Sequence, residues 1–186
     1  MSGSDHTSLD ASPWVRRWSH LVAPGATVLD VACGTGRHVR WFAARGCKVT
    51  AIDRNATALE ALRPIAGVHV ADIEGAPWPL RGARFDAVVC TNYLWRPLLP
   101  TLVDAIAPGG VLIYETFAVG NESVGKPSNP DFLLRPGELL EAVRGLRVVA
   151  YEDGFLAAPE RYLQRVVAAC DAGAPGAAER RNLAPD

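Results

Sequence analysis

The sequence has little cysteine and no excess of either charge. Its four cysteines stand apart and form no Cys-x-x-Cys pair, at positions 33, 47, 90 and 170. This spacing argues against a zinc site and against a disulfide framework, so we expect no metal and expect the cysteines to be buried as small apolar side chains. The chain has 19 basic and 20 acidic residues. That balance provides no long-range attraction for a polyanion, so nucleic acid is not an expected partner.

Long apolar runs are also missing. No stretch reaches the roughly 18 residues that span a membrane, and the first eleven residues lack the pattern of a signal peptide. We therefore expect a cytoplasmic protein without a membrane partner. The 186 residues, 49% of them hydrophobic, suit one compact domain. We predict a single domain over residues 1–172, flexible over 1–11, followed by a disordered tail over 173–186 that is rich in Ala, Gly and Pro.

The most informative segment is an apolar strand that runs into a glycine turn. Residues 28–31 read Val-Leu-Asp-Val, and Gly34 and Gly36 follow within Ala-Cys-Gly-Thr-Gly. Glycine removes the Cβ atom that would keep a ligand away from the main chain, and it permits left-handed dihedrals. A second strand, 49–53, ends in Asp53, whose two oxygens can accept hydrogen bonds from a ribose diol. The pairing predicts a nucleoside cofactor site.

Two residues distinguish between nucleoside cofactors. A dinucleotide fingerprint counted from Gly34 and Gly36 needs glycine or alanine at position 39, where this chain has Val39. The carboxylate of Asp30 would also repel a diphosphate near the helix N-terminus. A cationic sulfonium with an amino-acid tail meets neither objection.

These residues make the chain resemble the class I S-adenosylmethionine-dependent methyltransferases, whose first motif is apolar-apolar-Asp/Glu-x-Gly-x-Gly-x-Gly. Ala32 stands where the first glycine is usual. The resemblance implies S-adenosyl-L-methionine as cofactor and S-adenosyl-L-homocysteine as product. It also implies that an acid after the third strand reaches the adenine amino group. The cofactor-binding residues expected from the motif and the resemblance are Asp30, Ala32, Cys33, Gly34, Gly36, Asp53, Arg54, Asp72, Ile73 and Thr91.

Further elements fit the same family. Strands are predicted at 68–73, 85–91 and 111–117, and a helix at 98–106 ends at a Pro-Gly-Gly that the family places before its fifth strand. Two β-rich runs, 146–151 and 162–170, are predicted to form a hairpin through Asp153-Gly154. The expected fold class is α/β, a Rossmann-like open sheet of about seven strands. Most of these strands are parallel, with a C-terminal antiparallel hairpin and helices on both faces.

A helix is predicted to begin at Ser12, which can cap it, with Pro13 in its first turn. Its apolar stripe contains Trp14, which we assign to the core in preference to the cofactor site. A second helix follows the glycine turn and ends near Gly46. His38 in its first turn is an acceptor-side candidate, as a base or substrate ligand; a hydrogen-bonded structural histidine is the equal alternative.

Acceptor contacts are expected from the loops after the fourth and fifth strands, because ligands of open α/β sheets bind at that edge. Asn92 and Tyr93 offer donors and acceptors there, and Trp95 offers an apolar wall or a face for a cation. The loop at 118–136 is rich in Gly, Pro and Asn. A long loop at the ligand edge is typical of a lid or an acceptor-binding element.

The wider segment, 115–140, resembles the corresponding region of tellurite-resistance-type and related small bacterial methyltransferases. There Pro-x-x-Pro-Asp/Glu-aromatic-Leu-Leu-x-Pro-Gly-Glu-Leu comes before the sixth strand. Lys126 and Arg135 are placed to hold an anionic acceptor. Alternatively, Arg135 pairs with Glu138 or Glu141 and fixes the loop, which is the interpretation we favour.

The predicted function is methyl transfer to a small-molecule acceptor, which is a metabolite, a xenobiotic or a chalcogen oxyanion. In-line displacement from a sulfonium needs alignment and desolvation more than a catalytic triad, so no catalytic residue is assigned beyond the candidates Asn92, Tyr93 and His38. Three alternatives stay open: an RNA methyltransferase that works with a partner, a non-catalytic S-adenosylmethionine-binding protein, and an NAD(P)-dependent oxidoreductase. The oligomeric state is not predicted.

Overall fold

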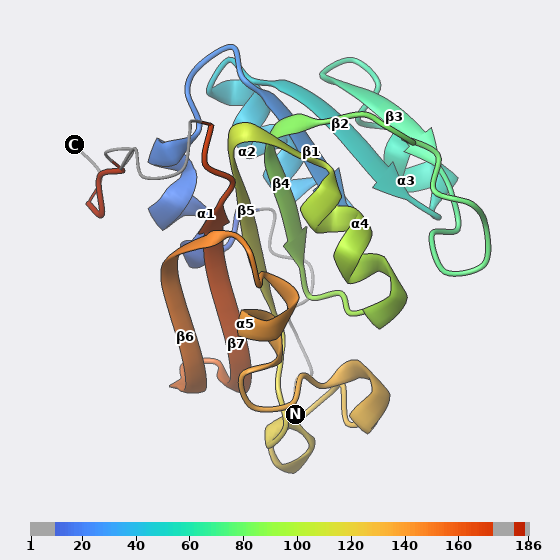
Figure 1. Ribbon diagram of the computed structural model, residues 1–186. Coiled ribbons are helices and arrows are strands. Elements are labelled where there is room, and N and C mark those ends of the chain that lie inside the picture. Colours follow the sequence, from blue (N-terminus) through green and yellow to red (C-terminus); the bar gives the residue numbers. More distant parts are fainter. Residues whose placement is uncertain (1–9, 173–180, 185–186) are drawn as a thin grey trace.

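A computed structural model describes residues 10–172 and 181–184, and its centre is one seven-stranded sheet (Figure 1). The sheet order is β3-β2-β1-β4-β5-β7-β6. The first five strands pair in parallel, and β7 lies antiparallel to both β5 and β6. The predicted α/β fold class is therefore confirmed. The strands are β1 Thr27–Val31, β2 Lys48–Asp53, β3 Ala66–Val70, β4 Phe85–Thr91, β5 Ile106–Phe117, β6 Arg147–Ala157 and β7 Glu160–Ala169.

Helices cover both faces of the sheet, as expected. Residues of α1, α2 and α3 pack in one apolar cluster with one face, whereas α4 and α5 pack in a second cluster with the other. The α-helices are α1 Pro13–Trp18, α2 Arg37–Ala44, α3 Ala56–Glu60, α4 Leu99–Asp104 and α5 Glu138–Ala142. Short 3-10 turns are η1 Ser19–Leu21, η2 Arg96–Leu98, η3 Asn121–Ser123 and η4 Pro130–Phe132.

The central strand β4 shows why the sequence folds this way. Ala87 and Val89 belong to the cluster under α1 and α2, and Val88 and Cys90 belong to the opposite cluster. Because successive side chains of a strand point to opposite faces, a continuous apolar run fits a strand that is covered on both sides. The bounds predicted for this strand are confirmed.

The first helix also follows its prediction. The Ser12 hydroxyl accepts a hydrogen bond from the Val15 N–H at 3.0 Å, and Pro13 occupies the first turn. Trp14 is only 1% exposed and packs in the core. The assignment of Trp14 to the core is therefore confirmed.

Four predicted boundaries were wrong. The third strand ends at Val70, before Asp72, because Asp72 already accepts the N–H groups of the next turn. The helix predicted over 98–106 ends at Asp104. Pro108-Gly109-Gly110 lies inside β5, at an irregularity in its pairing with β4, so it does not precede the strand.

The fourth error concerns the C-terminal hairpin. Asp153 and Gly154 form no turn, because they pair with Gln164 and Leu163 within a longer ladder, and the strands reverse at Ala158-Pro159. The antiparallel hairpin itself is confirmed at the sheet edge, with β6 as its outer strand.

The predicted flexible start and tail fall largely on residues 1–9, 173–180 and 185–186, which lie outside the described residues. Within the described part, Arg181 forms an ion pair with Asp171 at 3.2 Å. Cys33, Cys47 and Cys90 are buried as predicted, and Cys170 is partly exposed; all four are free thiols. None of the described helices is long and apolar enough to cross a membrane.

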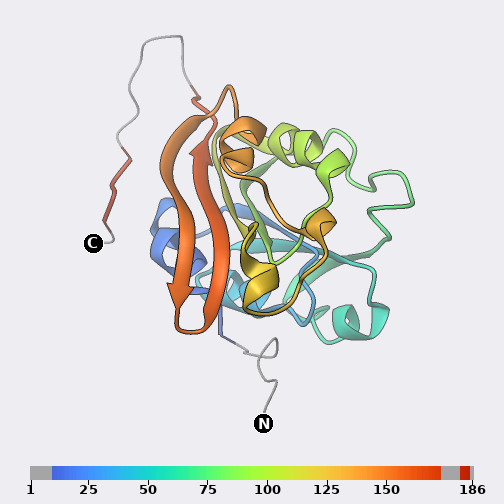
Figure 2. The same ribbon diagram turned by 90° about the horizontal axis from the view of Figure 1, so that it is seen from below.

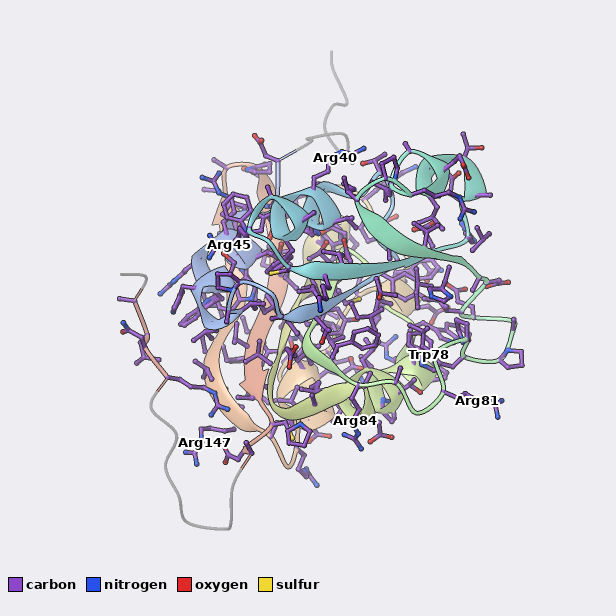
Figure 3. All side chains as sticks on the ribbon, turned by 90° about the horizontal axis from the view of Figure 1, so that it is seen from above. Arg40, Arg45, Trp78, Arg81, Arg84 and Arg147 are labelled. Atoms are coloured by element: carbon purple, nitrogen blue, oxygen red, sulfur yellow. The ribbon has the colours of Figure 1, made fainter. Side chains whose placement is uncertain are left out.

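The positive charges that Figure 3 labels do not form one stripe. Arg40, Arg45, Arg81 and Arg147 lie at separate points around the outline of the molecule (Figure 3). This spread agrees with the balanced net charge of the sequence.

Candidate functional site

The glycine turn after β1 presents bare main chain beside open space. Gly34 and Gly36 have φ of 55° and 79°, in the left-handed region. A Cβ atom on Gly34 would meet nothing within 4 Å, whereas one on Gly36 would come within 2.5 Å of Leu62. Gly34 therefore leaves room for a ligand, and Gly36 leaves room for the core. Ala32, at φ 52°, adopts the same left-handed backbone despite its Cβ.

Asp53, at the end of β2, forms a hydrogen bond with the main chain of this turn. Its Oδ2 accepts a hydrogen bond from the Gly34 N–H at 2.8 Å, and its Oδ1 accepts one from the Asn55 N–H at 2.8 Å. Each oxygen of a carboxylate can accept more than one hydrogen bond. Asp53 therefore keeps acceptor capacity for a ribose diol while it holds the turn in place.

Asp30 is a buried carboxyl group without a full set of partners. It is 1% exposed, and its Oδ2 has no hydrogen-bond partner among the described residues. Burial raises the pKa of Asp30 to about 8, although the nearby Arg37 guanidinium and a hydrogen bond from the Val39 backbone act in the opposite direction. An orphaned carboxyl oxygen next to the turn that is expected to bind the cofactor fits a cation-bearing ligand, because a charge partner would stabilise its ionised form.

The other predicted cofactor residues lie at or just after the ends of four neighbouring strands, β1 to β4. Thr91, at the end of β4, accepts a hydrogen bond from Arg37 at 3.3 Å. Asp72 accepts the N–H groups of Glu74 and Gly75 through one oxygen. Cys33 is buried in the turn, Arg54 is exposed, and Ile73 packs partly against the core.

These residues fit an adenosyl group with an amino-acid tail. Gly34 leaves main chain uncovered, Asp53 faces that main chain, and Asp30 supplies an unsatisfied carboxyl oxygen beneath it. Among the described residues, no group of three His, Cys, Asp or Glu side chains could hold a metal ion. The cofactor contacts themselves stay predictions.

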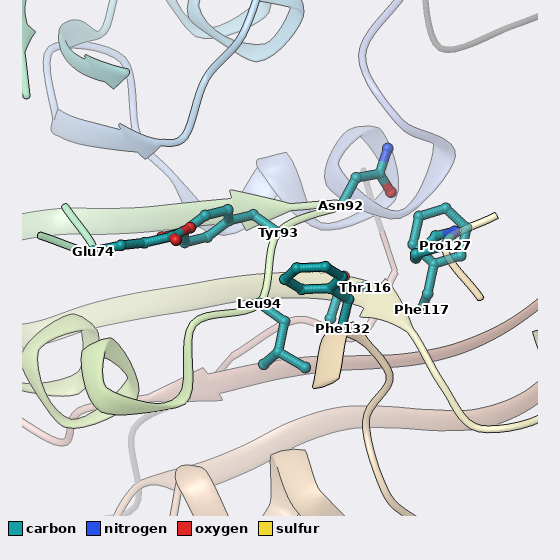
Figure 4. A pocket seen from close by; sticks show the side chains of 8 residues that line it. All are labelled: Glu74, Asn92, Tyr93, Leu94, Thr116, Phe117, Pro127 and Phe132. Atoms are coloured by element: carbon teal, nitrogen blue, oxygen red, sulfur yellow. The ribbon is translucent and has the colours of Figure 1, made fainter. Parts of the chain in front are cut away.

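A pocket with a cavity volume of about 290 Å³ lies next to this site, beyond the ends of β4 and β5 (Figure 4). It includes Asn92 and Tyr93, the two predicted acceptor-side residues, and Pro127 and Phe132 from the 118–136 loop. The structure thus brings together the two regions that the sequence suggested for the acceptor. The lining residues are Glu74, Asn92, Tyr93, Leu94, Thr116, Phe117, Pro127 and Phe132.

Asn92 and Tyr93 are held by backbone contacts. Asn92 has φ 54°, a left-handed conformation that asparagine tolerates, and its N–H donates to the Glu115 carbonyl at 2.9 Å. The buried Tyr114 hydroxyl donates to the Tyr93 carbonyl at 2.7 Å. β5 therefore sets the position of the loop that follows β4.

The 118–136 loop is fixed at several points. Arg96 donates to the Asp131 and Leu133 carbonyls at 2.7 and 2.8 Å, and its guanidinium contacts both oxygens of Glu138 at 2.6 and 3.0 Å. The side chain of Asn121 is buried and donates to the Pro127 carbonyl at 3.0 Å. Seen from below, the segment after β5 crosses this end of the molecule beside β7 (Figure 2).

Three other candidates lie away from the pocket lining. His38 is 1% exposed, and its Nε2 accepts the Ser12 N–H at 3.2 Å, so its contact is with the start of α1. Burial lowers the pKa of His38 to about 3, and this placement favours the structural alternative over a base or substrate ligand. Trp95 packs against the second core cluster. Arg135 pairs with Glu138 at 3.5 Å, which confirms the favoured interpretation, whereas Glu141 pairs with Arg144.

Sequence reasoning missed several pocket and support residues. Thr116 and Phe117, at the start of the acceptor segment expected after the fifth strand, do line the pocket, whereas Glu74, two residues beyond a predicted cofactor acid, was not expected there. Arg96 and Glu138 are far apart in sequence, so no local pattern links them. Tyr114 was a signal in the sequence, as a hydroxyl group that directly follows the apolar run Val111-Leu112-Ile113.

Comparisons with known proteins agree with this geometry. Residues 28–110 match the family described as "Methyltransferase domain". Malonyl-[acyl-carrier protein] O-methyltransferase of Serratia marcescens is 35% identical over 108 residues, which are 53% of this chain and 41% of that protein. Ribosomal protein L11 methyltransferase of Burkholderia mallei is 34% identical over 116 residues, which are 59% of this chain and 37% of that protein. The chain thus spans about two fifths of these relatives.

Solved structures resemble the whole fold. TehB from Haemophilus influenzae has a TM-score of 0.65 at 20% identity. The match includes 81% of this chain and 59% of TehB. An S-adenosylmethionine-dependent methyltransferase from Mesorhizobium loti has a TM-score of 0.67 at 18% identity. The match includes 87% of this chain and 100% of that protein. With its glycine turn, its two acids and its sheet order, the chain has the fold of the class I S-adenosylmethionine-dependent methyltransferases, and its residues 28–110 are similar to a methyltransferase domain.

Proposed function

We propose that the chain transfers the methyl group of S-adenosyl-L-methionine to a small molecule held in the pocket beyond β4 and β5. One observation carries this proposal: Asn92, which directly follows Thr91 at the end of β4, lines the pocket, and β4 lies beside β1 in the sheet. The turn expected to hold the cofactor and the pocket expected to hold the acceptor are therefore neighbours at one edge of the sheet.

Bound S-adenosyl-L-methionine supplies a methyl group on a positively charged sulfur. In the transfer a bond forms between an acceptor atom and the methyl carbon, the carbon–sulfur bond breaks, and its electron pair stays on sulfur. The acceptor atom gives up a proton if it arrives protonated. No step in this exchange requires a protein nucleophile.

The residues of the pocket contribute alignment and desolvation. Leu94 and Phe117 are each only 5% exposed and form apolar walls that exclude water. Asn92 and Tyr93 provide polar groups that can orient an acceptor, and their backbones are fixed by β5. Alignment of this kind can supply much of the acceleration of a displacement reaction.

Macromolecular acceptors are the second possibility. The two curated relatives are named for an acyl-carrier protein and a ribosomal protein, but this chain spans only 41% and 37% of them. We favour a small molecule because the pocket has a volume of about 290 Å³ and its mouth is bordered by the chain's own loop. The absence of a nucleic-acid partner and the cytoplasmic location stay predictions.

Calorimetry with S-adenosyl-L-homocysteine and with NADH tests the cofactor, and a screen of small methyl acceptors with labelled S-adenosyl-L-methionine tests turnover. We expect S-adenosyl-L-homocysteine to bind, NADH to give no heat, and at least one acceptor to take up label. Tight NADH binding without a response to S-adenosyl-L-homocysteine would contradict the proposal. Cofactor binding with no transfer to any acceptor, in the presence of cell extract as well, would favour a non-catalytic binding protein.

A further inference from the structure

The acceptor pocket has one acidic lining residue and no basic one. Of the described residues that line it, only Glu74 carries a charge at neutral pH, and the rest are apolar or neutral polar side chains. Glu74 is exposed at the edge of the pocket. A carboxylate there repels anions and attracts cations or hydrogen-bond donors, and solvent and salt reduce the size of the effect. The charge of the pocket therefore bears directly on which acceptors can enter.

Two arginines near the loop are already engaged. Arg96 uses its guanidinium on Glu138 and on two loop carbonyls, and Arg135 pairs with the same Glu138. Lys126 precedes Pro127 in the chain, yet only Pro127 contributes to the lining. Among the described residues that line the pocket, Glu74 therefore has no basic side chain beside it.

A buried hydroxyl group lies at the same end of the pocket, beside Glu74. No described residue meets hydrogen-bond geometry with the Tyr93 hydroxyl, and the Glu74 carboxylate is the acceptor near enough to act on it. Burial, and then the nearby Glu74 carboxylate, raise the pKa of Tyr93, so the phenol stays neutral and the two groups lie close together. Figure 4 shows both side chains at one end of the pocket. A ligand donor placed there could reach Glu74 while the Tyr93 hydroxyl bonds to the ligand.

The remaining walls favour a flat apolar body. Leu94 and Phe117 are buried, whereas the ring of Phe132 is 46% exposed at the mouth. An exposed aromatic ring beside a pocket gains free energy when a ligand covers it. The walls thus accept an apolar ring and leave polar recognition to the end where Glu74 lies.

We propose, on the basis of the function proposed above, that the acceptor is a compact, largely apolar molecule, uncharged or cationic. Phe117 and Phe132 hold its apolar body, and Glu74 and Tyr93 hold a hydrogen-bond donor or cationic group. Glu74 acts as a specificity residue that excludes carboxylates and oxyanions from the pocket. The proposal thereby removes the chalcogen oxyanion from the acceptor classes suggested by the sequence.

Three probes that share one ring test this selectivity. Benzylamine is cationic, benzyl alcohol is neutral with a donor, and benzoate is anionic. Their affinities for the protein are measured by NMR titration, with and without S-adenosyl-L-homocysteine. We expect benzylamine and benzyl alcohol to bind at least about tenfold more tightly than benzoate.

Matched variants assign the effect to single residues. Glu74→Gln should weaken benzylamine binding and strengthen benzoate binding, so that the preference shrinks by about tenfold. Phe132→Ala should weaken all three probes alike, because it removes apolar wall and no charge. Glu60→Gln removes an acid from α3, where Glu60 pairs with Arg63, and should leave the ranking unchanged.

Four results would overturn the inference: equal binding of benzoate and benzylamine, a preference that survives Glu74→Gln, a loss of S-adenosyl-L-homocysteine affinity in that variant, or no binding of any probe. The third would place Glu74 at the adenine. Failure of S-adenosyl-L-homocysteine to bind the unaltered protein would instead contradict the proposed function. The ranking of probes without cofactor is a separate readout, so the two failures are distinguishable.

Discussion

The Oδ2 atom of Asp53 lies 2.8 Å from the backbone nitrogen of Gly34 and accepts its hydrogen bond. This contact joins the end of β2 to the turn that follows β1. The carboxylate expected to bind the ribose therefore also shapes the main chain expected to lie beneath the adenosyl group. Cofactor affinity and turn geometry depend on one side chain, which makes Asp53 the most sensitive position of the site.

Replacing Asp53 by alanine should weaken S-adenosyl-L-homocysteine binding by about ten- to a hundredfold, because charge-assisted hydrogen bonds contribute about 1.5 to 3 kcal/mol. Calorimetric titration measures the change. Asp104→Ala, an exposed acid at the end of α4, is the control and should bind normally. Unchanged affinity in Asp53→Ala would show that this carboxylate does not contact the cofactor.

The two glycines of the turn should respond differently to the same substitution. Both have left-handed backbones, so alanine costs each about 1 to 2 kcal/mol of stability. Gly34→Ala adds no clash with the protein and should mainly abolish cofactor binding. Gly36→Ala also pushes against the buried Leu62 and should lose more stability. Urea unfolding and calorimetry separate the two effects; equal stability losses would contradict this division.

The sequence predicted the elements that periodicity and glycine turns define. β4 has its predicted bounds because a strand covered on both faces is a nearly continuous apolar run, here interrupted only by the exposed Asp86 near its start. The Asp153-Gly154 turn signal failed because long-range pairing with Gln164 and Leu163 outweighs a local preference. At the site, Asn92 and Tyr93 could be predicted from their place after a strand. The contact of Arg96 with Glu138 could not, because it joins residues that only the folded loop brings together.

Asp30 should release a proton when a cationic cofactor binds. With its pKa raised to about 8 by burial, the carboxyl group is mostly protonated at pH 7 in the free protein. A bound cation favours the ionised form and lowers the pKa, so a proton leaves the site. Calorimetry of S-adenosyl-L-methionine binding in phosphate and in Tris buffer reports this release through the difference in heat. Asp30→Asn should abolish the buffer dependence; a dependence that persists would assign the proton to another group.

His38 should make the fold sensitive to acid. Burial lowers its pKa from the 6.5 of an ordinary histidine to about 3 in the folded protein. Between these two pH values, His38 is protonated in the unfolded chain and neutral in the folded chain. Stability from this group is therefore complete above pH 6.5 and lost as the pH falls toward 3. Between pH 7 and pH 5 the loss should be about 2 kcal/mol in urea unfolding. His38→Gln retains an acceptor for the Ser12 N–H but has no group that titrates. Its loss of stability between pH 7 and pH 5 should therefore be about 2 kcal/mol smaller than that of the unaltered protein.

Arg96 should control the acceptor pocket without affecting the cofactor. Its guanidinium joins the loop carbonyls of Asp131 and Leu133 to Glu138, whose side chain is only 10% exposed. Burial alone would raise the pKa of Glu138, but the bonds from Arg96 and Arg135 hold it below its ordinary value. Removing Arg96 leaves a half-enclosed carboxylate with fewer partners and frees two carbonyls, so the loop should open more often.

In Arg96→Met, amide hydrogen exchange at Val119 and Leu134, whose backbone groups pair across the base of the loop, should accelerate by about tenfold or more, as expected for a local opening that is easier by about 1.4 kcal/mol. Affinity for S-adenosyl-L-homocysteine should stay within about twofold, because the cofactor residues lie on other loops. Arg144→Met breaks the exposed pair with Glu141 and is the matched control, with unchanged exchange. Slow exchange in Arg96→Met would show that Asn121 and the Ala118–Leu134 bridge are sufficient to hold the loop. A loss of cofactor affinity would show instead that the loop and the cofactor site form one cooperative unit.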